Sequence, residues 1–142
     1  MIHIIPTVDH EIFGNGTGNP RKNMILPLQK MAEIFNKHSA PLTIFPDVDE
    51  IIKFEYFKQE VKEYYGYEVH NEITEQLKAL YRLGNDIQLH VHPQWTGAKF
   101  NNGDWGIKDG NKNIYDLVED GVDVKAYLGK RFTYLKELLI DI

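Results

Sequence analysis

Residues 84–93 of this chain read Gly84-Asn85-Asp86-Ile87-Gln88-Leu89-His90-Val91-His92-Pro93. Residues 87–91 are predicted to form a short buried strand, because a Gly-Asn turn signal precedes them and a proline follows soon after. Residues i and i+2 of a strand project to the same face, so His90 and His92 are expected to lie side by side. The segment therefore predicts a strand that ends in two neighbouring imidazoles.

Two earlier segments, residues 2–8 and 41–45, are also short and apolar, and both are predicted to be buried strands. Apolar residues at helical spacing predict helices between and after the strands, the first beginning near Pro27 and the last near Val124. The residues expected to face inward are Leu28, Met31, Ala32 and Phe35; Ile51, Phe54, Phe57, Val61 and Tyr64; Val69, Ile73, Leu77 and Leu80; and Leu128, Phe132, Leu135 and Leu139.

The alternation of strands and helices predicts an α/β fold with a parallel sheet. In such folds, ligands bind at the carboxyl ends of the strands. The three predicted strands end in Asp9-His10-Glu11, in Asp47-Val48-Asp49 and in His90-Val91-His92. Because all three ends carry polar side chains, we expect the functional site at this edge of the sheet.

Two imidazoles on one strand face can bind one divalent cation, and neutral imidazole suits Zn, Ni, Co or Fe. We expect zinc, with cobalt, nickel or manganese as alternatives. A mononuclear hydrolase needs a third protein ligand and a proton acceptor. We assign Asp9 as the third metal ligand beside His90 and His92, and Asp9 and Glu11 as the catalytic carboxylates, with Glu11 as the base. The reverse assignment stays open, as do structural roles for the histidine pair and for Asp9.

Two further residues are candidates for substrate binding. Asp47 follows the second strand, but an aspartate before a helix is also a common N-cap. Trp95 lies in a glycine-rich loop, together with Phe100 and Trp105, where aromatic rings could stack on a sugar. The alternative for these aromatic residues is that they fill the core beneath the loop.

The composition fits one globular domain of 142 residues, with 42% hydrophobic and 26% charged residues. The net charge of −5 and scattered basic residues argue against nucleic acid as a partner. There is no cysteine, and no apolar run is long enough to span a bilayer or act as a signal peptide. These features agree with a cytoplasmic protein, which is what we expect.

The segment Gly84–Trp95 resembles the strand of a divergent branch of the polysaccharide deacetylase superfamily, whose motif includes Q-L-H-x-H-P-x-W. Three other segments are similar to that family: Thr7–Glu11 to its acidic motif, Pro41–Phe45 to its second strand, and Ala98–Trp105 to the loop after the histidines. Two features differ from the usual family pattern. Asp9 is followed by His10 rather than by a second aspartate, and one residue rather than three separates the histidines.

The resemblance implies a distorted (β/α) barrel, a metal bound by one acidic residue and two histidines, and hydrolysis of an N-acetyl or other C–N amide on a carbohydrate. Two other functions stay open: a non-catalytic carbohydrate-binding or interaction module with a vestigial metal site, and a metal-dependent phosphoesterase. The phosphoesterase is disfavoured because the sequence lacks a second histidine-rich cluster.

A barrel of this type needs about seven strand–helix units of about 30 residues each. Residues 1–142 supply three predicted strands, so we expect a partial or truncated barrel that corresponds to the N-terminal portion of the family fold. An open parallel edge and apolar helix faces would tend to recruit another chain. We therefore expect a homo-oligomer in which a second copy covers the open side.

Overall fold

The computed structural model describes residues 3–107 and 112–140. The elements follow in chain order: β1 (Thr7–His10), the π-helical turn η1 (Arg21–Ile25), α1 (Leu26–Lys37), β2 (Thr43–Pro46), α2 (Val48–Tyr56), α3 (Lys58–Tyr65), α4 (Val69–Arg82), β3 (Asp86–Ile87), the 3₁₀ turn η2 (Pro93–Gly97), β4 (Phe100–Asn101), β5 (Asp104–Trp105), α5 (Ile114–Glu119) and α6 (Val124–Ile140).

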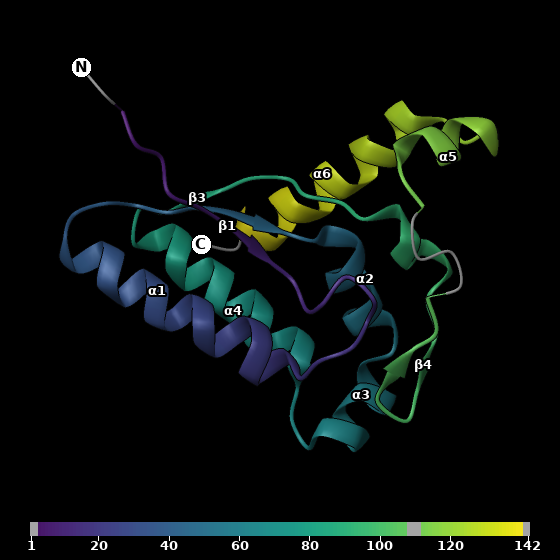
Figure 1. Cartoon of the computed structure of the whole chain (residues 1–142), viewed down its shortest axis with the longest axis horizontal. Coiled ribbons are helices and arrows are strands. Elements are labelled where there is room, and N and C mark those ends of the chain that lie inside the picture. The colour runs from purple at the N-terminus through teal and green to yellow at the C-terminus, as the bar shows by residue number, and fades with distance from the viewer. Residues whose placement is uncertain (1–2, 108–111, 141–142) are drawn as a thin grey trace.

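Strands β1, β2 and β3 form a parallel sheet in that spatial order, and β4 pairs with β5 in a small hairpin. The predicted α/β fold with parallel strands between helices is confirmed. Across residues 3–107 and 112–140, the strands do not close into a barrel. Figure 1 shows α1 and α4 side by side along the sheet, and α6 packs against α2 and α4.

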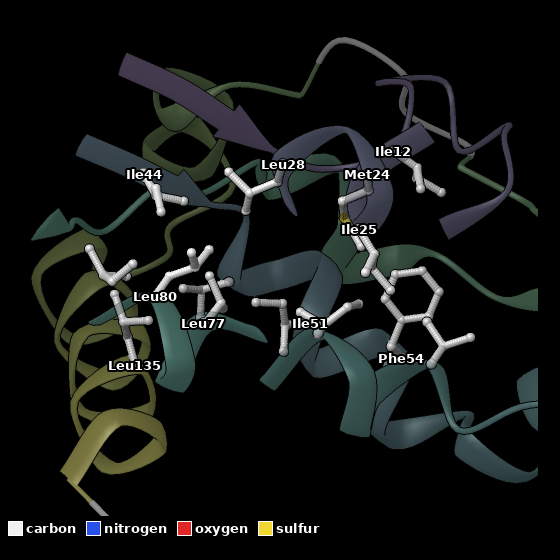
Figure 2. Close-up of a cluster of buried hydrophobic side chains, with 14 of the residues drawn as sticks. Ile12, Met24, Ile25, Leu28, Ile44, Ile51, Phe54, Leu77, Leu80 and Leu135 are labelled. Atoms are coloured by element: carbon white, nitrogen blue, oxygen red, sulfur yellow. The ribbon is translucent and has the colours of Figure 1, made fainter. Parts of the chain in front are cut away.

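One face of the sheet packs on the helices. Along β2, Ile44 and Pro46 are buried, whereas Thr43 and Phe45 on the opposite face are half-buried. Figure 2 shows Ile44 in the same cluster as buried side chains from four helices: Leu28 of α1, Ile51 and Phe54 of α2, Leu77 and Leu80 of α4, and Leu135 of α6. The sheet is thus fixed mainly by apolar burial on one side.

The first and third strands are shorter than the sequence predicted. The backbone amide of Thr43, the first residue of β2, donates to the oxygen of Pro6. Residues before Pro6 therefore extend beyond the start of β2 and have no strand beside them in the described part of the chain. Ile4 and Ile5 are accordingly 86% and 72% exposed, and the prediction that they lie in a buried strand is wrong. Strand β3 covers only Asp86–Ile87, although an isolated parallel bridge joins Asp47 to His90 farther along.

Helical boundaries differ in three places. The single helical run predicted from Ile51 to Tyr64 is divided at Phe57 into α2 and α3. The first helical segment begins at Arg21 rather than near Pro27, with Pro20 as its N-cap residue. Helix α5, for which no helix was predicted, begins after Asn113, whose side chain forms a capping box with Asp116. Helix α6 begins at Val124 as predicted.

The expected inward face of α6 is only partly buried. Leu135 is buried, but Phe132 is 59% exposed. Of the helices in the described ranges, none is long and apolar enough to cross a membrane.

Candidate metal centre

The ends of the three parallel strands meet at one edge of the sheet. The backbone nitrogen of Asp47, which follows β2, donates to the oxygen of His10 at 3.3 Å, and Val48 donates to the oxygen of His90 at 3.0 Å. Glu11 follows β1 directly, and His92 follows His90 by two residues. The register therefore places Glu11, Asp47 and the histidine pair next to one another, although they are far apart in the sequence.

Glu11, His90 and His92 form a cluster whose geometry suits a metal ion. The Oε2 atom of Glu11 lies 3.3 Å from Nε2 of each histidine, and the two Nε2 atoms are 2.7 Å apart. Ligand atoms about 2.0–2.1 Å from a tetrahedral ion lie about 3.3 Å from one another. The two distances from Glu11 match this spacing, whereas the two Nε2 atoms share a hydrogen bond and lie closer together than a tetrahedral ion would hold them. With a small separation of the two rings, the three side chains could bind one divalent ion.

The donor set and its exposure also fit such an ion. Two imidazole nitrogens and one carboxylate oxygen form a ligand set found in zinc hydrolases. The Oε2 atom of Glu11 is buried and, within the described part of the chain, accepts no hydrogen bond of good geometry. The side chains are 21–30% exposed, with Glu11 at 21% and His92 at 30%, so a ligand could approach from solvent. A cation at this point would bind an oxygen that accepts no well-formed hydrogen bond from the described residues.

Within the protein alone, the carboxylate and the imidazoles stabilise each other's charge. Pairing with Glu11 raises the pKa of His90 above 6.5, although burial opposes this shift, and the charges of Asp47 and Asp9 add to it. Burial acts to raise the pKa of Glu11, but pairing with His90 and the proximity of His92 outweigh it and lower the pKa. The pairing therefore favours an ionised carboxylate, the form that binds metal, and also a proton on His90, which a metal ion would have to displace.

The structure brings Glu11, and not Asp9, to the histidines. Asp9 is exposed on β1 and does not belong to the cluster of possible ligands. Of the two carboxylates considered for the third ligand, Glu11 lies close enough to both histidines to share an ion with them, and Asp9 does not. Strand β1 ends at His10, and the chain bends at Glu11, which turns its carboxylate toward His90 and His92.

His10 points away from the site, as expected for the residue between Asp9 and Glu11. Its side chain is 3% exposed, and Nε2 lies 3.1 Å from Oε1 of Gln76 in α4. Burial lowers the pKa of His10 to about 4, although the hydrogen bond with Gln76 acts in the opposite direction. His10 is therefore a neutral core residue that joins β1 to α4.

Asp47 is completely buried and caps helix α2. Its Oδ1 atom accepts from the backbone amides of Asp49 at 3.0 Å, Glu50 at 3.4 Å and His92 at 3.2 Å. The N-cap alternative is thus the observed one, and a fully buried Asp47 has no surface with which to contact a substrate. Burial raises its pKa well above the ordinary range, and the negative charges of Asp49 and Glu11 add to the increase.

Trp95 lies in the core rather than on the surface. It is 1% exposed and packs edge-on against Trp105, with the ring centroids 5.3 Å apart. Trp105 is also 1% exposed, and Phe100 is half-buried beside it. At this burial neither indole has a free face on which a sugar ring could stack.

Glu50 is a buried residue of the site region that sequence reasoning missed. It is 1% exposed, and its two oxygens each lie 3.2 Å from the backbone nitrogen of Ile12, the residue after Glu11. Burial raises the pKa of Glu50 well above its ordinary value, and the charge of Asp47 adds to the increase. In the sequence, Asp47-x-x-Glu50 has the form of a helix capping box, which is typical of a surface turn and gives no sign of burial.

No family model, curated protein or solved structure matches this chain.

Proposed function

We propose that this chain is a metal-dependent hydrolase that cleaves a C–N amide bond, with an N-acetylated sugar or surface-polysaccharide precursor as substrate. The observation that supports it is the convergence of Glu11, His90 and His92 at the carboxyl edge of a parallel sheet. The sugar substrate follows from the resemblance to polysaccharide deacetylases. A divalent metal bound there, with zinc as the first choice, would polarise the amide carbonyl and activate water.

The residues of the chain divide into two roles in this proposal. Glu11, His90 and His92 bind the metal. Asp9 accepts the proton of the attacking water, because it is the exposed carboxylate two residues before Glu11, and its charge acts on His90. On the sequence alone, Asp9 is assigned as the ligand and Glu11 as the base, and the reverse stays open. The proposal takes the reverse, with Glu11 as the ligand and Asp9 free for proton transfer.

The test separates metal binding from turnover. The purified protein is loaded with Zn²⁺, Co²⁺, Ni²⁺ or Mn²⁺, and acetate release is measured on N-acetylated chito-oligosaccharides. Asp9→Asn should bind metal as the wild type does, yet lose about 10²–10⁴-fold in rate. Glu11→Gln should lose metal and turnover together. His38→Ala, a change of an exposed histidine outside the site, serves as the control for adventitious metal.

Two outcomes would count against the proposal. If the protein binds metal through Glu11, His90 and His92 but releases no acetate with any of the four ions, the carbohydrate-binding alternative is favoured. If Asp9→Asn retains full activity, Asp9 is not the proton acceptor.

A further inference from the structure

The first turn of α2 contacts the backbone next to each candidate metal ligand. Asp47 accepts from the amide of His92 at 3.2 Å, and Val48 donates to the oxygen of His90 at 3.0 Å. On the other side, Asp47 donates to the oxygen of His10, and Glu50 accepts from the amide of Ile12, so the two residues that flank Glu11 are fixed. One helical turn thus joins the two segments that carry the ligands.

Two of these contacts depend on side chains that the chain buries at a cost. Asp47 is 0% and Glu50 is 1% exposed. Burying a carboxyl group is unfavourable unless it is well paired. Neither pairs with a lysine or arginine in the described residues, and Oδ2 of Asp47 has no hydrogen-bond partner there. A role in helix capping alone would be served by an exposed side chain, so their burial calls for a second role.

We propose that Asp47 and Glu50 are positioning residues, which set the distance between Glu11 and the two histidines through the backbone at Ile12 and His92. Glu50 fixes the peptide after Glu11, and Asp47 fixes the amide of His92 itself. This inference rests on the metal site of the proposed function but not on its reaction. It applies equally if the chain binds metal without catalysing hydrolysis.

The nearby Asp49 provides a matched control. It is 3% exposed and lies in the same helical turn, but its carboxylate accepts from Tyr127 and Arg131 of α6 and contacts neither ligand segment. Asp49→Asn and Glu50→Gln are the same acid-to-amide change on two buried residues, one position apart. Only the second should alter the metal site.

The experiment measures the dissociation constants of Zn²⁺ and Co²⁺, and the visible absorption spectrum of the Co²⁺ form, which depends on ligand geometry. Glu50→Met removes both acceptor oxygens and should weaken binding about 10–100-fold, the range for residues that orient metal ligands. Glu50→Gln keeps one acceptor and should weaken binding about tenfold, with a changed Co²⁺ spectrum. Asp49→Asn should stay within about threefold of wild type.

The role of Asp47 is tested by comparing a variant that removes its accepting oxygen with one that keeps it. Asp47→Ala should weaken metal binding about 10–100-fold, whereas Asp47→Asn keeps the accepting oxygen and should restore it to within about threefold. The inference is overturned if Glu50→Met binds metal as the wild type does, or if Asp49→Asn weakens binding as much as Glu50→Gln. If Glu50→Met does not fold, the comparison of Glu50→Gln with Asp49→Asn decides. If Glu50→Met and Asp47→Ala lose acetate release but bind metal with unchanged affinity, the positioning role is contradicted and the proposed function stays intact.

Discussion

His10 donates a hydrogen bond from Nε2 to Oε1 of Gln76, across 3.1 Å between β1 and α4. The direction follows from Gln76, whose amide nitrogen donates to the backbone oxygen of Ile25 at 2.7 Å and leaves Oε1 as the acceptor. The Nδ1 atom of His10 is buried and has no partner among the described residues. A proton on Nδ1 would therefore be buried without an acceptor.

This relationship predicts a loss of stability in acid. The pKa of His10 falls from an ordinary 6.5 to about 4 on folding, so the unfolded chain binds the proton more readily. The stability that the neutral His10 contributes is fully present above pH 6.5 and is lost as the pH falls toward 4. Between about pH 7.5 and about pH 5, His10 should account for a loss of about 2 kcal/mol in the free energy of unfolding.

Urea unfolding of metal-free protein at the two pH values measures this effect. His10→Gln should remove that part of the pH dependence, whereas His38→Gln, at an exposed position, should leave it unchanged. An equal pH dependence in wild type and His10→Gln would show that other groups cause it.

A second prediction concerns metal and stability. An ion that binds only the folded chain stabilises it by mass action, by about 2.7 kcal/mol at a hundredfold excess over the dissociation constant. Zn²⁺ should therefore raise the midpoint of thermal unfolding, and a chelator should reverse the change. His90→Ala and His92→Ala should abolish the shift, whereas His38→Ala should keep it. A Zn²⁺-induced shift that survives in both site variants would indicate binding elsewhere.

The core makes a third prediction. Leu77 of α4 is fully buried in the cluster of Figure 2, whereas Leu83 at the end of the same helix is 67% exposed. Leu77→Ala should lower the free energy of unfolding by about 2–5 kcal/mol. Leu83→Ala should change it by less than about 0.5 kcal/mol. Chemical denaturation measures the free energy of unfolding of both variants. Similar losses in the two would contradict the finding that α4 buries Leu77 and exposes Leu83.

A fourth prediction concerns the contact of α6 with α2. Arg131 donates from Nε to Asp49 at 2.8 Å, stacks over Tyr127, and is only 17% exposed. Arg131→Met leaves a buried carboxylate without its cation and should cost about 3 kcal/mol.

The double variant Arg131→Met, Asp49→Asn should be more stable than the sum of the two single losses predicts, because neither charge is then left alone. Additive losses in urea unfolding would show that the pair does not interact.

The sequence was sufficient to predict the three strands of the parallel sheet and the edge at which the candidate metal ligands lie. Short apolar segments that end in polar residues mark the three strand ends, and the i, i+2 rule places His90 beside His92. The sequence could not distinguish Asp9 from Glu11, because both lie on the same face of an ideal strand. The choice depends on β1 ending at His10, which is determined by its pairing with β2.

Burial of polar and aromatic residues was the harder part. Glu50 looks like an exposed capping residue until β1 lies against the start of α2, a contact between distant parts of the chain. Trp95 and Trp105 lie in a glycine-rich segment that has the composition of a surface loop. Both are buried because the β4–β5 hairpin folds back on α2 and α3, which no local pattern in the sequence reveals.

The separation of Glu11, His90 and His92 along the chain also determines when the candidate metal site can form. Glu11 reaches the histidines only after β1 and the β3 segment have both paired with β2, and parallel pairing of distant segments is slow in folding. An ion added to the unfolded chain would encounter the two histidines without the carboxylate. Metal should therefore slow unfolding much more than it accelerates folding, because its third ligand arrives after the rate-limiting pairing.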